Sequence, residues 1–282
     1  RMKVPFGIAQ SGKAFRNEIN PKNFIYRSRE FEQMEMEWFC HPDEAENYFE
    51  YWKNQRIEWY QKMGLKKENL RIKEIPEDDL PHYARQGADI EYKYPFGWGE
   101  LEAVHNRGDW DLSNHAKHSG KNLKYFDQET KEEYFPHIIE TSGGLGRSLL
   151  AFLVEGYTEV EGGRTKTTKA TKKVERVLKF NKELAPIKVA VLPLVKNKEE
   201  LTKKAKGVLE LLNPYFKCYY DEVGSIGRRY RRQDEIGTLF AVTVDFETLE
   251  KNDVTVRDRD TMKQERIKIE ELVEYFEKIL EE

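Results

Sequence analysis

The chain has 282 residues and a formal net charge of −3, with 38% hydrophobic and 35% charged residues. That apolar content is enough for the cores of one large or two ordinary domains, and two cysteines, Cys40 and Cys218, exclude a zinc site made of cysteine alone. No apolar stretch is long enough to cross a bilayer and none near Arg1 resembles a signal, so we expect a cytoplasmic protein without a membrane partner.

The first predicted elements are two strands and a helix. Residues 4–10 indicate a short strand that continues toward a turn near Asn20. Residues 24–40 alternate in their later part between glutamate and apolar or aromatic side chains, which is typical of a strand. Two strands around a polar loop form an antiparallel pair. Residues 43–63 follow as a helix, and their aromatic stripe predicts packing on a sheet more readily than stacking on nucleic acid bases.

The middle of the chain predicts more strands and a second glycine-rich turn. Residues 88–104 indicate strands around a first such turn, residues 135–140 a short apolar strand, and residues 148–156 a helix. Residues 161–173 are polar, rich in threonine and lysine and without periodicity, which predicts a linker or a mobile insertion.

From Ala185 onward, short strands and amphipathic helices alternate. The expected strands are residues 187–195, 217–220, 239–245 and 254–258, and the expected helices are residues 198–212, 225–235 and 269–280. A small α/β domain with a mixed sheet follows from this order. We therefore predict two domains, residues 1–184 and residues 185–282.

A charged constellation surrounds the loop between the first two strands. Arg16 and Glu18 precede the loop, and Arg29, Phe31 and Glu35 follow it. Strand residues of equal parity share one face, so these side chains offer a fork for phosphate, a carboxylate for amino groups and an aromatic plane for a base. On pattern alone, an exposed sheet whose charges pair with one another explains the same residues equally well.

Residues 140–147 (ETSGGLGR) connect a predicted strand to a predicted helix. Small residues there let a ligand approach the backbone, and Arg147 at the helix start is placed to meet a phosphate. The glycine spacing fits neither a P-loop nor a dinucleotide-binding fingerprint. A purely structural turn is the commoner explanation of such a segment.

His115 and His118 are spaced as metal ligands on one face of a helix would be. No acidic or cysteine ligand is obvious nearby, and Gly120 follows at once. Metal binding is therefore the less favoured interpretation of this pair.

A basic cluster surrounds Tyr230 in a predicted helix. The cluster consists of Arg228, Arg229, Arg231 and Arg232. Such residues grip an RNA backbone and an aromatic ring among them stacks on a base, although a solvated helix face is an equally good explanation.

Taken together, these segments resemble one protein family. The letters FRNE, a loop and then RSREFEQME resemble motif 2 of the class II aminoacyl-tRNA synthetases, and ETSGGLGR before an apolar helix resembles their motif 3. Glycyl-tRNA synthetases of the homodimeric type are similar over a longer series of segments, namely GIAQSGKAFRNEI, REFEQMEMEWF, FGWGELE, RGDWDL, HSGKNLKYFD, LAPIKVAVLPL and SIGRRYRRQDEIGTLFAVTVDF. The similarity runs from Val4 to the C-terminus.

The resemblance implies a fold of the α+β class. It implies a class II catalytic domain with an antiparallel sheet and motifs 2 and 3 in residues 1–184, and an α/β anticodon-binding domain with a mixed sheet in residues 185–282. The implied activity is ATP-dependent ligation of glycine to its tRNA through a glycyl-adenylate. ATP and Mg²⁺ are the implied cofactors, and the complete protein is expected to be a homodimer.

Roles for site residues follow from matching positions in the family. Arg16 resembles the arginine that grips the α-phosphate of ATP, Glu18 the carboxylate near the adenine amino group, and Arg147 the arginine on the γ-phosphate; these three are the implied catalytic residues. Phe31 is implied to stack on adenine, and Glu100 to lie beside the ATP-bound Mg²⁺. The implied ATP-binding set is Arg16, Asn17, Glu18, Tyr26, Arg27, Ser28, Arg29, Glu30, Phe31, Glu100, Leu101, Gly144, Leu145, Gly146 and Arg147. The implied glycine-binding set is Phe31, Glu32, Gln33, Met34, Glu35, Glu140, Thr141, Ser142, Gly143 and Gly144, and the implied tRNA-binding set is Arg228, Arg229, Arg231 and Arg232.

The resemblance has gaps. Motif 1 and an upstream Arg-Pro-Glu segment have no counterpart in the chain, so we expect the chain by itself to activate glycine poorly. Thr141 and Gly143 stand where the family usually has proline and alanine, and Leu239 replaces a usual proline.

Two alternatives come from other classes of protein. A non-catalytic paralogue that binds nucleic acid, such as the accessory subunit of mitochondrial DNA polymerase, would have lost the arginines that grip ATP, whereas Arg16, Arg29 and Arg147 are present. An ATP-binding regulator would have a degraded tRNA domain, whereas the segment SIGRRYRRQDEIG is intact.

Overall fold

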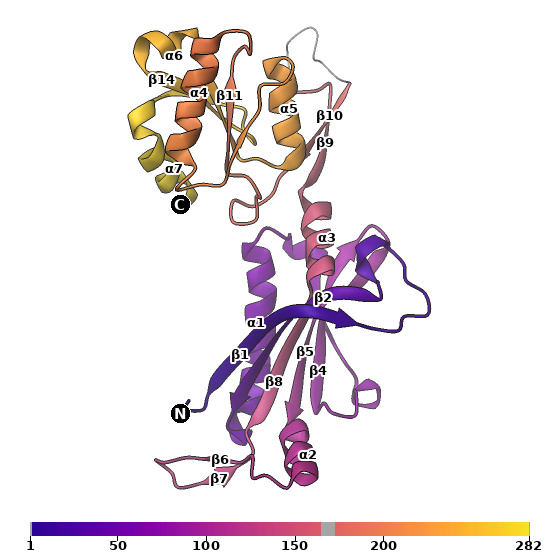
Figure 1. The fold of residues 1–282 in the computed structure, drawn as a ribbon. Coiled ribbons are helices and arrows are strands. Elements are labelled where there is room, and N and C mark those ends of the chain that lie inside the picture. The colour runs from indigo at the N-terminus through magenta and orange to yellow at the C-terminus, as the bar shows by residue number, and fades with distance from the viewer. Residues whose placement is uncertain (1, 165–172, 282) are drawn as a thin grey trace. The chain divides into compact units, whose positions relative to one another are not determined.

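The computed structural model describes residues 2–164 and 173–281. The chain divides into two compact units, Arg1–Glu155 and Gly156–Glu282, which are described separately (Figure 1). Part of the expected linker or insertion, residues 165–172, lies outside the described residues. No helix in the described ranges combines the length and the apolar character needed to cross a membrane.

The first unit is built on an antiparallel sheet. In spatial order its strands are β1 (Phe6–Phe15), β2 (Glu30–Cys40), β8 (His137–Gly144), β5 (Gly97–Gly108), β4 (Gln86–Tyr94) and β3 (Leu70–Glu74). The predicted pairing of the first two strands is confirmed, with Phe15 opposite Glu30. β8 lies between β2 and β5, so that Glu35 is opposite Ser142 although the two residues are far apart in the chain.

Helices cover one face of this sheet. α1 (Ala45–Lys62) and α3 (Leu145–Gly156) pack on it through a hydrophobic core that includes Phe49, Ile139 and Ala151 (Figure 1). The predicted packing of an aromatic helix on a sheet is therefore confirmed. Elements outside this core are the 3₁₀ helices η1 (Phe24–Tyr26), η2 (Pro42–Glu44), η3 (Lys67–Asn69) and η4 (Glu77–Asp79), the helix α2 (Trp110–Ser119), and the short strands β6 (Tyr125–Phe126) and β7 (Glu133–Tyr134).

A β-bulge in β5 changes which face its side chains use. Ile90 pairs with Glu102 and Glu91 pairs with Glu100, which leaves Leu101 as the extra residue. Leu101 and Glu102 are both buried on the helix side of the sheet. Because the bulge interrupts the regular alternation, the side chain of Glu100 is turned to the open face, where it lines a cavity.

The second unit contains a mixed sheet between helices, as predicted. In spatial order the strands are β12 (Cys218–Tyr220), β11 (Val189–Pro193), β13 (Phe240–Val244), β14 (Asp253–Asp258) and β15 (Gln264–Lys268). β11 is parallel to β12 and β13, and the remaining pairs are antiparallel. The helical elements are α4 (Glu199–Leu212), α5 (Ile226–Ile236), α6 (Phe246–Lys251), η5 (Ile269–Glu271) and α7 (Leu272–Glu281).

A hairpin that precedes this sheet also belongs to the second unit. It consists of β9 (Tyr157–Glu161) and β10 (Val174–Leu178), which pair antiparallel. Beyond it, Arg259 donates hydrogen bonds to the backbone carbonyl oxygens of Phe180 and Gly237, at 2.8 Å and 3.0 Å. The compact units divide before Gly156, whereas the expected domain boundary lies after residue 184, because residues 156–164 and 173–184 belong with the second unit.

Candidate active site

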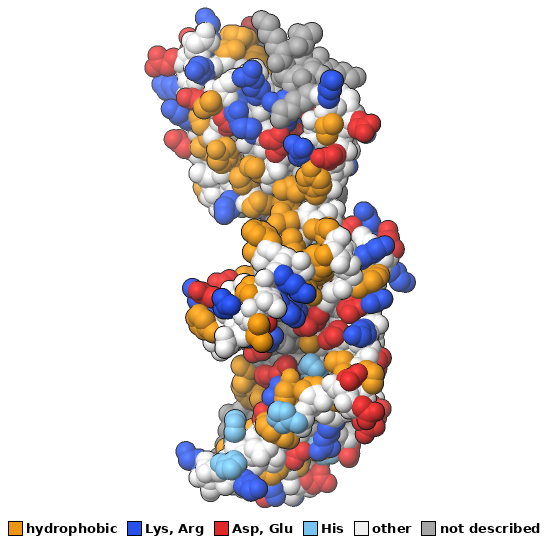
Figure 2. Space-filling model, turned by 90° about the vertical axis from the view of Figure 1, so that its right-hand side faces the viewer, with side chains coloured by type: hydrophobic (Ala, Val, Ile, Leu, Met, Phe, Trp, Pro, Cys, Tyr) orange, Lys and Arg blue, Asp and Glu red, His pale blue; other side chains and the backbone are white. Residues whose placement is uncertain are grey.

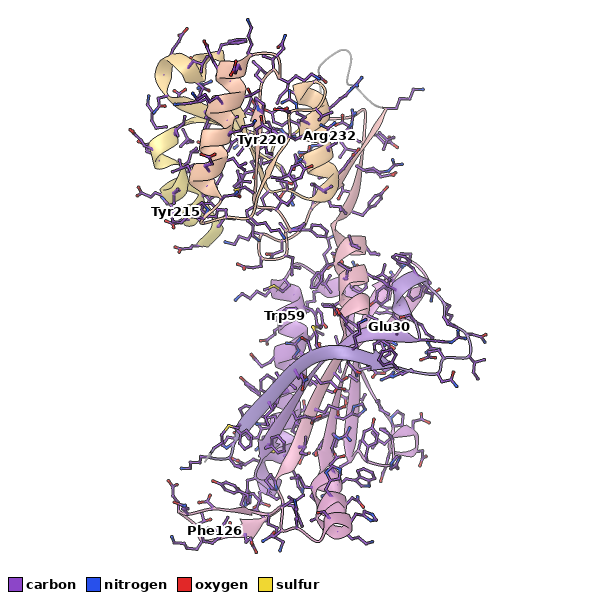
Figure 3. All side chains as sticks on the ribbon, viewed as in Figure 1. Glu30, Trp59, Phe126, Tyr215, Tyr220 and Arg232 are labelled. Atoms are coloured by element: carbon purple, nitrogen blue, oxygen red, sulfur yellow. The ribbon has the colours of Figure 1, made fainter. Side chains whose placement is uncertain are left out.

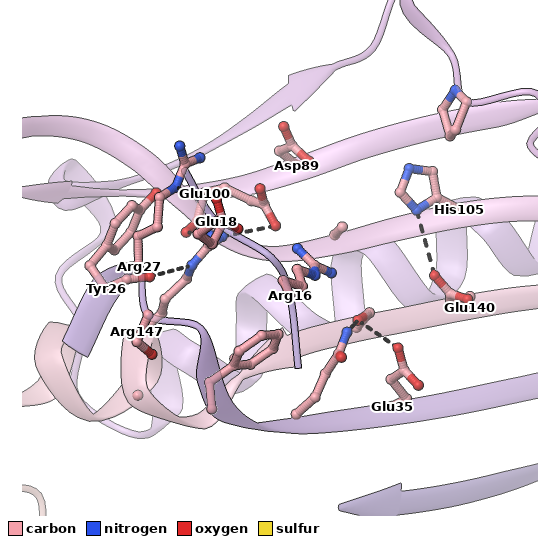
Figure 4. Close-up of a pocket in the computed structure, with 18 of the residues that line it drawn as sticks. Arg16, Glu18, Tyr26, Arg27, Glu35, Asp89, Glu100, His105, Glu140 and Arg147 are labelled. Atoms are coloured by element: carbon pink, nitrogen blue, oxygen red, sulfur yellow. Dashed lines mark hydrogen bonds and ion pairs between the residues drawn. The ribbon is translucent and has the colours of Figure 1, made fainter. Parts of the chain in front are cut away.

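A cavity of about 370 Å³ opens on the face of the first sheet that the helices leave uncovered (Figure 4). Its lining comes from the loop between β1 and β2, from the segment between β3 and β4, from β2, β4, β5 and β8, and from the start of α3. Strand alternation explains which strand residues line the cavity. Every second residue of β2 (Phe31, Gln33 and Glu35) and of β8 (Glu140 and Ser142) has its side chain on this face. The cavity thus joins segments that are distant in sequence on one sheet.

Two guanidinium groups enter the cavity, that of Arg147 at one end and that of Arg16 nearer the middle (Figure 4). The backbone N–H of Arg16 donates to the carbonyl oxygen of Arg29 at 2.9 Å, and its guanidinium carbon lies 5.4 Å from the centre of the Phe31 ring. Arg147 is held more closely: its Nε donates to the carbonyl oxygen of Tyr26 at 3.2 Å, and its guanidinium carbon lies 4.5 Å from the centre of the Tyr26 ring. Such fixed cations are suited to bind phosphate.

The loop between β1 and β2 is braced around Glu18. Arg29 donates from Nε to the backbone carbonyl oxygen of Glu18 at 2.9 Å, and Arg27 forms an ion pair with the Glu18 carboxylate at 3.9 Å. Arg29 therefore supports the loop through the backbone, while Glu18 and Arg27 present their side chains to the cavity.

Carboxylates stand beside the Arg147 end. Glu100 lies with Oε1 3.0 Å from Nη1 of Arg147, and its backbone carbonyl oxygen accepts a hydrogen bond from the same nitrogen at 3.2 Å. Asp89, on the neighbouring strand β4, also lines the cavity. Burial and the negative charge of Glu100 raise the pKa of Asp89 to about 6.

A network of hydrogen bonds and ion pairs forms the other end of the cavity. Gln33 donates to the hydroxyl of Ser142 at 2.6 Å, and that hydroxyl donates to Glu35 at 3.1 Å (Figure 4). Arg107 donates to Glu140 at 2.6 Å, and Nδ1 of His105 lies 3.8 Å from the other oxygen of Glu140. These groups fit a small ligand that carries a positive charge.

Glu140 is buried yet ionised. Burial alone would raise its pKa, but the neighbouring His105 imidazole and the charge of Arg107 outweigh burial and hold the pKa below its usual range. Arg107 is itself fixed, because it donates two hydrogen bonds to Asp111, at 2.7 Å and 3.0 Å, and stacks on the ring of Tyr83 at 4.2 Å. The carboxylate is therefore held in one orientation.

The structure brings most of the expected site residues to this cavity. Those that line it are Arg16, Glu18, Tyr26, Arg27, Ser28, Phe31, Gln33, Glu35, Glu100, Glu140, Ser142, Gly144, Gly146 and Arg147. Those that do not line it are Asn17, Arg29, Glu30, Glu32, Met34, Leu101, Thr141, Gly143 and Leu145. Strand alternation turns Glu32 and Met34 to the other face, and the bulge leaves Leu101 only 1% exposed in the core.

Sequence analysis missed several residues of the cavity. They are Ile25, Ile75, Pro81, Tyr83, Asp89, Ala103, His105 and Arg107. Ala103 lay on a predicted strand, whereas His105 and Arg107 lie beyond its expected end at residue 104, because β5 continues to Gly108. Equal parity of the three residues along the longer strand places them on one face.

The basic cluster of α5 is divided by the structure. Arg229 is 1% exposed, and it donates to the carbonyl oxygen of Leu194 at 3.0 Å and to that of Pro193. Its expected contact with RNA is corrected, because its guanidinium is consumed by buried backbone oxygens.

The side chains of the other three arginines differ in how far they are exposed. Arg231 has a side chain only 13% exposed and lies 3.9 Å from Glu175 and from Glu235. Arg228 is exposed. Arg232, which Figure 3 labels beside α5, has a side chain that is 41% exposed and that pairs with Asp221. Arg228 and Arg232 are therefore the members that remain accessible to RNA.

Charge on the second unit is mixed. Figure 2 shows Lys and Arg side chains interspersed with acidic and hydrophobic ones on the face in view.

The two histidines considered as metal ligands, His115 and His118, lie on α2 of the first unit. Across residues 2–164 and 173–281, no group of three or more His, Cys, Asp or Glu side chains is arranged to hold a metal ion by itself.

Comparison with known protein families matches both units. Residues 1–157 match the tRNA synthetase class II core domain (G, H, P, S and T), and residues 188–279 match an anticodon binding domain. A glycine–tRNA ligase of Streptomyces coelicolor is 55% identical over 280 residues, and one of Thermobifida fusca is 51% identical over 278 residues. Each alignment covers 98% of this chain but 60% and 59% of the relative, so the chain spans about three fifths of the length of these relatives.

A solved structure supports the fold. The prolyl-tRNA synthetase of Cryptosporidium parvum, complexed with L-proline and AMP, superposes with a TM-score of 0.70 at 20% sequence identity. The superposition covers 99% of this chain and 56% of that one. Because the class II core model matches more than half of the chain, the chain belongs to the class II aminoacyl-tRNA synthetases whose core domain is of the G, H, P, S and T type.

Proposed function

We propose that this protein ligates glycine to its tRNA. Glycine is first activated by ATP to glycyl-adenylate with release of pyrophosphate, and a tRNA hydroxyl then takes the glycyl group from the adenylate. The observation that carries the proposal is that a single cavity joins the guanidinium groups of Arg16 and Arg147 to the cluster of Glu35, Ser142 and Glu140. The identity with glycine–tRNA ligases supports glycine as the amino acid.

The nucleotide is proposed to bind between Arg16 and the end of the cavity at Arg147. Arg16 faces the α-phosphate and Arg147 the γ-phosphate, while Phe31 stacks on adenine and Glu18 accepts from its amino group. The close contacts of Arg147 with Tyr26 support this role, because a cation held in place needs little rearrangement as charge develops on the phosphates. Carboxylate and phosphate are reactive enough that positioning and charge neutralisation suffice, and no Cys or His nucleophile is required.

Mg²⁺ fits the same end as an ion carried by ATP. Mg²⁺ is usually held by one or two carboxylates together with phosphate oxygens. Glu100 and Asp89 are such carboxylates, and burial and their mutual repulsion raise the pKa of Asp89, a repulsion that a bound cation would relieve. We propose that these two side chains hold the ion, which would neutralise phosphate charge when bound.

Glycine is proposed to bind at the carboxylate end. Its ammonium group would lie against Glu35 and Glu140, with Ser142 between them in the hydrogen-bond network. Glycine is the smallest amino acid, so a closely lined pocket rejects larger ones by steric exclusion and needs no editing site.

The remaining functions are assigned to the second unit and to the whole protein. We propose that residues 185–282 act as the anticodon-binding domain and that Arg228 and Arg232 contact phosphates of the tRNA. We further propose that the complete protein is a homodimer that works in the cytoplasm, and that residues 1–184 act as its catalytic domain.

Glycine-dependent exchange of pyrophosphate into ATP tests this function. The full-length protein is incubated with ATP, Mg²⁺, labelled pyrophosphate and glycine, with alanine and proline as control amino acids. Exchange with glycine at least about a hundredfold faster than with alanine is expected, which corresponds to about 2.7 kcal/mol. Exchange that prefers another amino acid, or that is absent while ATP still binds, would contradict the proposal.

A further inference from the structure

A third glutamate stands directly behind the carboxylate end of the cavity. Glu37 of β2 is paired in register with Glu140 of β8, one step along the strand pair from Glu35 and Ser142. Glu37 is half-buried and does not line the cavity. Two carboxyl groups thus face each other across neighbouring strands of the sheet.

The charges around Glu37 do not balance. His105 and Arg107 of β5 lie beside Glu37 and Glu140, and Asp111 of α2 is bound to Arg107. On the other side, Glu35 of β2 adds a further negative charge. The residue of β1 that pairs with Glu37 is the uncharged Ile8. The guanidinium of Arg107 already donates hydrogen bonds to Glu140 and to Asp111.

One carboxyl oxygen of Glu37 has no hydrogen-bond partner among the described residues. This atom, Oε2, is buried. An ionised carboxylate at that position would be both unsatisfied and repelled by Glu140.

We propose that Glu37 carries a proton while the amino-acid site is empty and releases it to solvent when an ammonium group binds at Glu140. Glu37 is then a positioning residue for substrate binding, since the shared proton holds the Glu140 carboxylate in place until a cation replaces it. The inference rests on the proposed function, because it needs an amino acid at Glu140. Burial, the charge of Glu140 and a hydrogen bond with it raise the pKa of Glu37 to about 8, which supports a protonated group at neutral pH.

This arrangement distinguishes amino acids from other small acids. The incoming ammonium supplies the positive charge that the proton supplied before, so net charge at the site is conserved. A hydroxy acid of similar size brings no such charge and leaves Glu37 protonated. Selection for the amino group is thereby built into the pair behind the cavity as well as into its lining.

Calorimetry on the full-length protein tests the proposal. The sulfamoyl analogue of glycyl-adenylate and its hydroxyacetyl counterpart, which lacks the amino group, are titrated at pH 7.0 in buffers of different ionisation enthalpy. The parent should release more than about half a proton on binding the glycyl analogue, given a starting pKa near 8, and none on binding the hydroxyacetyl analogue. Glu37→Gln should release none with either, and Glu46→Gln, a matched change at an exposed position of α1, should behave as the parent.

A second measurement covers the case in which Glu37→Gln does not fold. In the parent, the affinity for the glycyl analogue relative to the hydroxyacetyl analogue should rise about tenfold from pH 6 to pH 7.5, because proton release favours binding as pH rises. Equal proton release by parent and Glu37→Gln, or an affinity ratio that does not change with pH, would overturn this inference alone. Failure of the glycyl analogue to bind any of the proteins would overturn the proposed function as well.

Discussion

The guanidinium of Arg147 lies 3.0 Å from a carboxylate oxygen of Glu100 and also donates to the backbone carbonyl oxygen of the same residue. In the ligand-free cavity Glu100 is therefore the countercharge of Arg147. Asp89 faces the same carboxylate from the neighbouring strand and has its pKa raised to about 6 by burial and by Glu100. An ion brought by ATP would relieve this repulsion and leave Arg147 free for phosphate.

Asp89→Asn should stabilise the ligand-free protein at pH 7 and weaken its use of Mg²⁺. A carboxyl whose pKa is raised on folding costs stability once pH exceeds its unfolded pKa, so the gain should be absent near pH 4, grow up to pH 6 and stay constant above it. Because Asp89 is partly exposed, we expect about 1 kcal/mol at pH 7. Urea unfolding at pH 4.5 and 7 measures the first effect, and the Mg²⁺ dependence of pyrophosphate exchange the second. A loss of stability at pH 7 would contradict the assigned repulsion.

Arg16→Ala should abolish most of the glycine-dependent exchange. The guanidinium beside Phe31 is proposed to neutralise the α-phosphate, and loss of one such group costs about 2.7 kcal/mol of transition-state stabilisation, or about a hundredfold in rate. Lys13→Ala is the control, since Lys13 is an exposed cation on β1 that pairs with Glu30. Exchange by Arg16→Ala within threefold of the parent would remove Arg16 from the proposed site.

Glu140→Gln should raise the KM for glycine far more than the KM for ATP. Only the amino-acid half of the cavity loses a countercharge, and the contacts of Arg147 are untouched. Ser142→Gly should leave alanine a poor substrate, because the neighbouring walls of the pocket remain. Exchange kinetics with glycine and alanine measure both, with Glu46→Gln on the exposed side of α1 as the control. Equal changes in the two KM values for Glu140→Gln would mean that Glu140 holds the fold rather than the substrate.

Substitutions in α5 should distinguish arginines that stabilise the fold from arginines that bind tRNA. Arg228→Glu with Arg232→Glu should weaken tRNA binding and its salt dependence while adenylate formation stays intact. Arg229→Ala should instead lower the free energy of unfolding by about 3 kcal/mol, because it leaves buried carbonyl oxygens without donors. Filter binding of tRNA at several salt concentrations and urea unfolding distinguish the two. Normal stability of Arg229→Ala together with weak tRNA binding would reverse the assignment.

The local parts of the fold were predictable from the sequence, and the non-local ones were not. Alternation in residues 24–40 indicates a strand, and the structure confirms its pairing with β1. No local pattern, however, indicates that β8 inserts between β2 and β5, since strand pairing at that separation depends on the packing of the whole sheet. Several short elements were also missed, namely α2, β3, β6, β7, β9, β10, α6 and β15.

Individual side chains in the site show the same division. The parity argument correctly placed Phe31 and Glu35 on one face, whereas it had no means to detect the bulge that separates Glu100 from Leu101. Arg229 looked like its neighbours in a charge run, and only its buried hydrogen bonds with β11 reveal a structural arginine. Charge and periodicity are local properties, but burial is decided by the tertiary structure.

The bulge in β5 separates the packing of the core from the layout of the cavity. Glu100 and Glu102 lie on opposite faces and already pair with the consecutive residues Glu91 and Ile90 of β4. Removal of residue 101 would therefore leave a regularly alternating strand in which Glu100, Ala103 and His105 keep the cavity face. What such a deletion would take away is the side chain of Leu101, which is only 1% exposed. The extra residue of this strand should therefore matter for the stability of the core rather than for the order in which side chains reach the cavity.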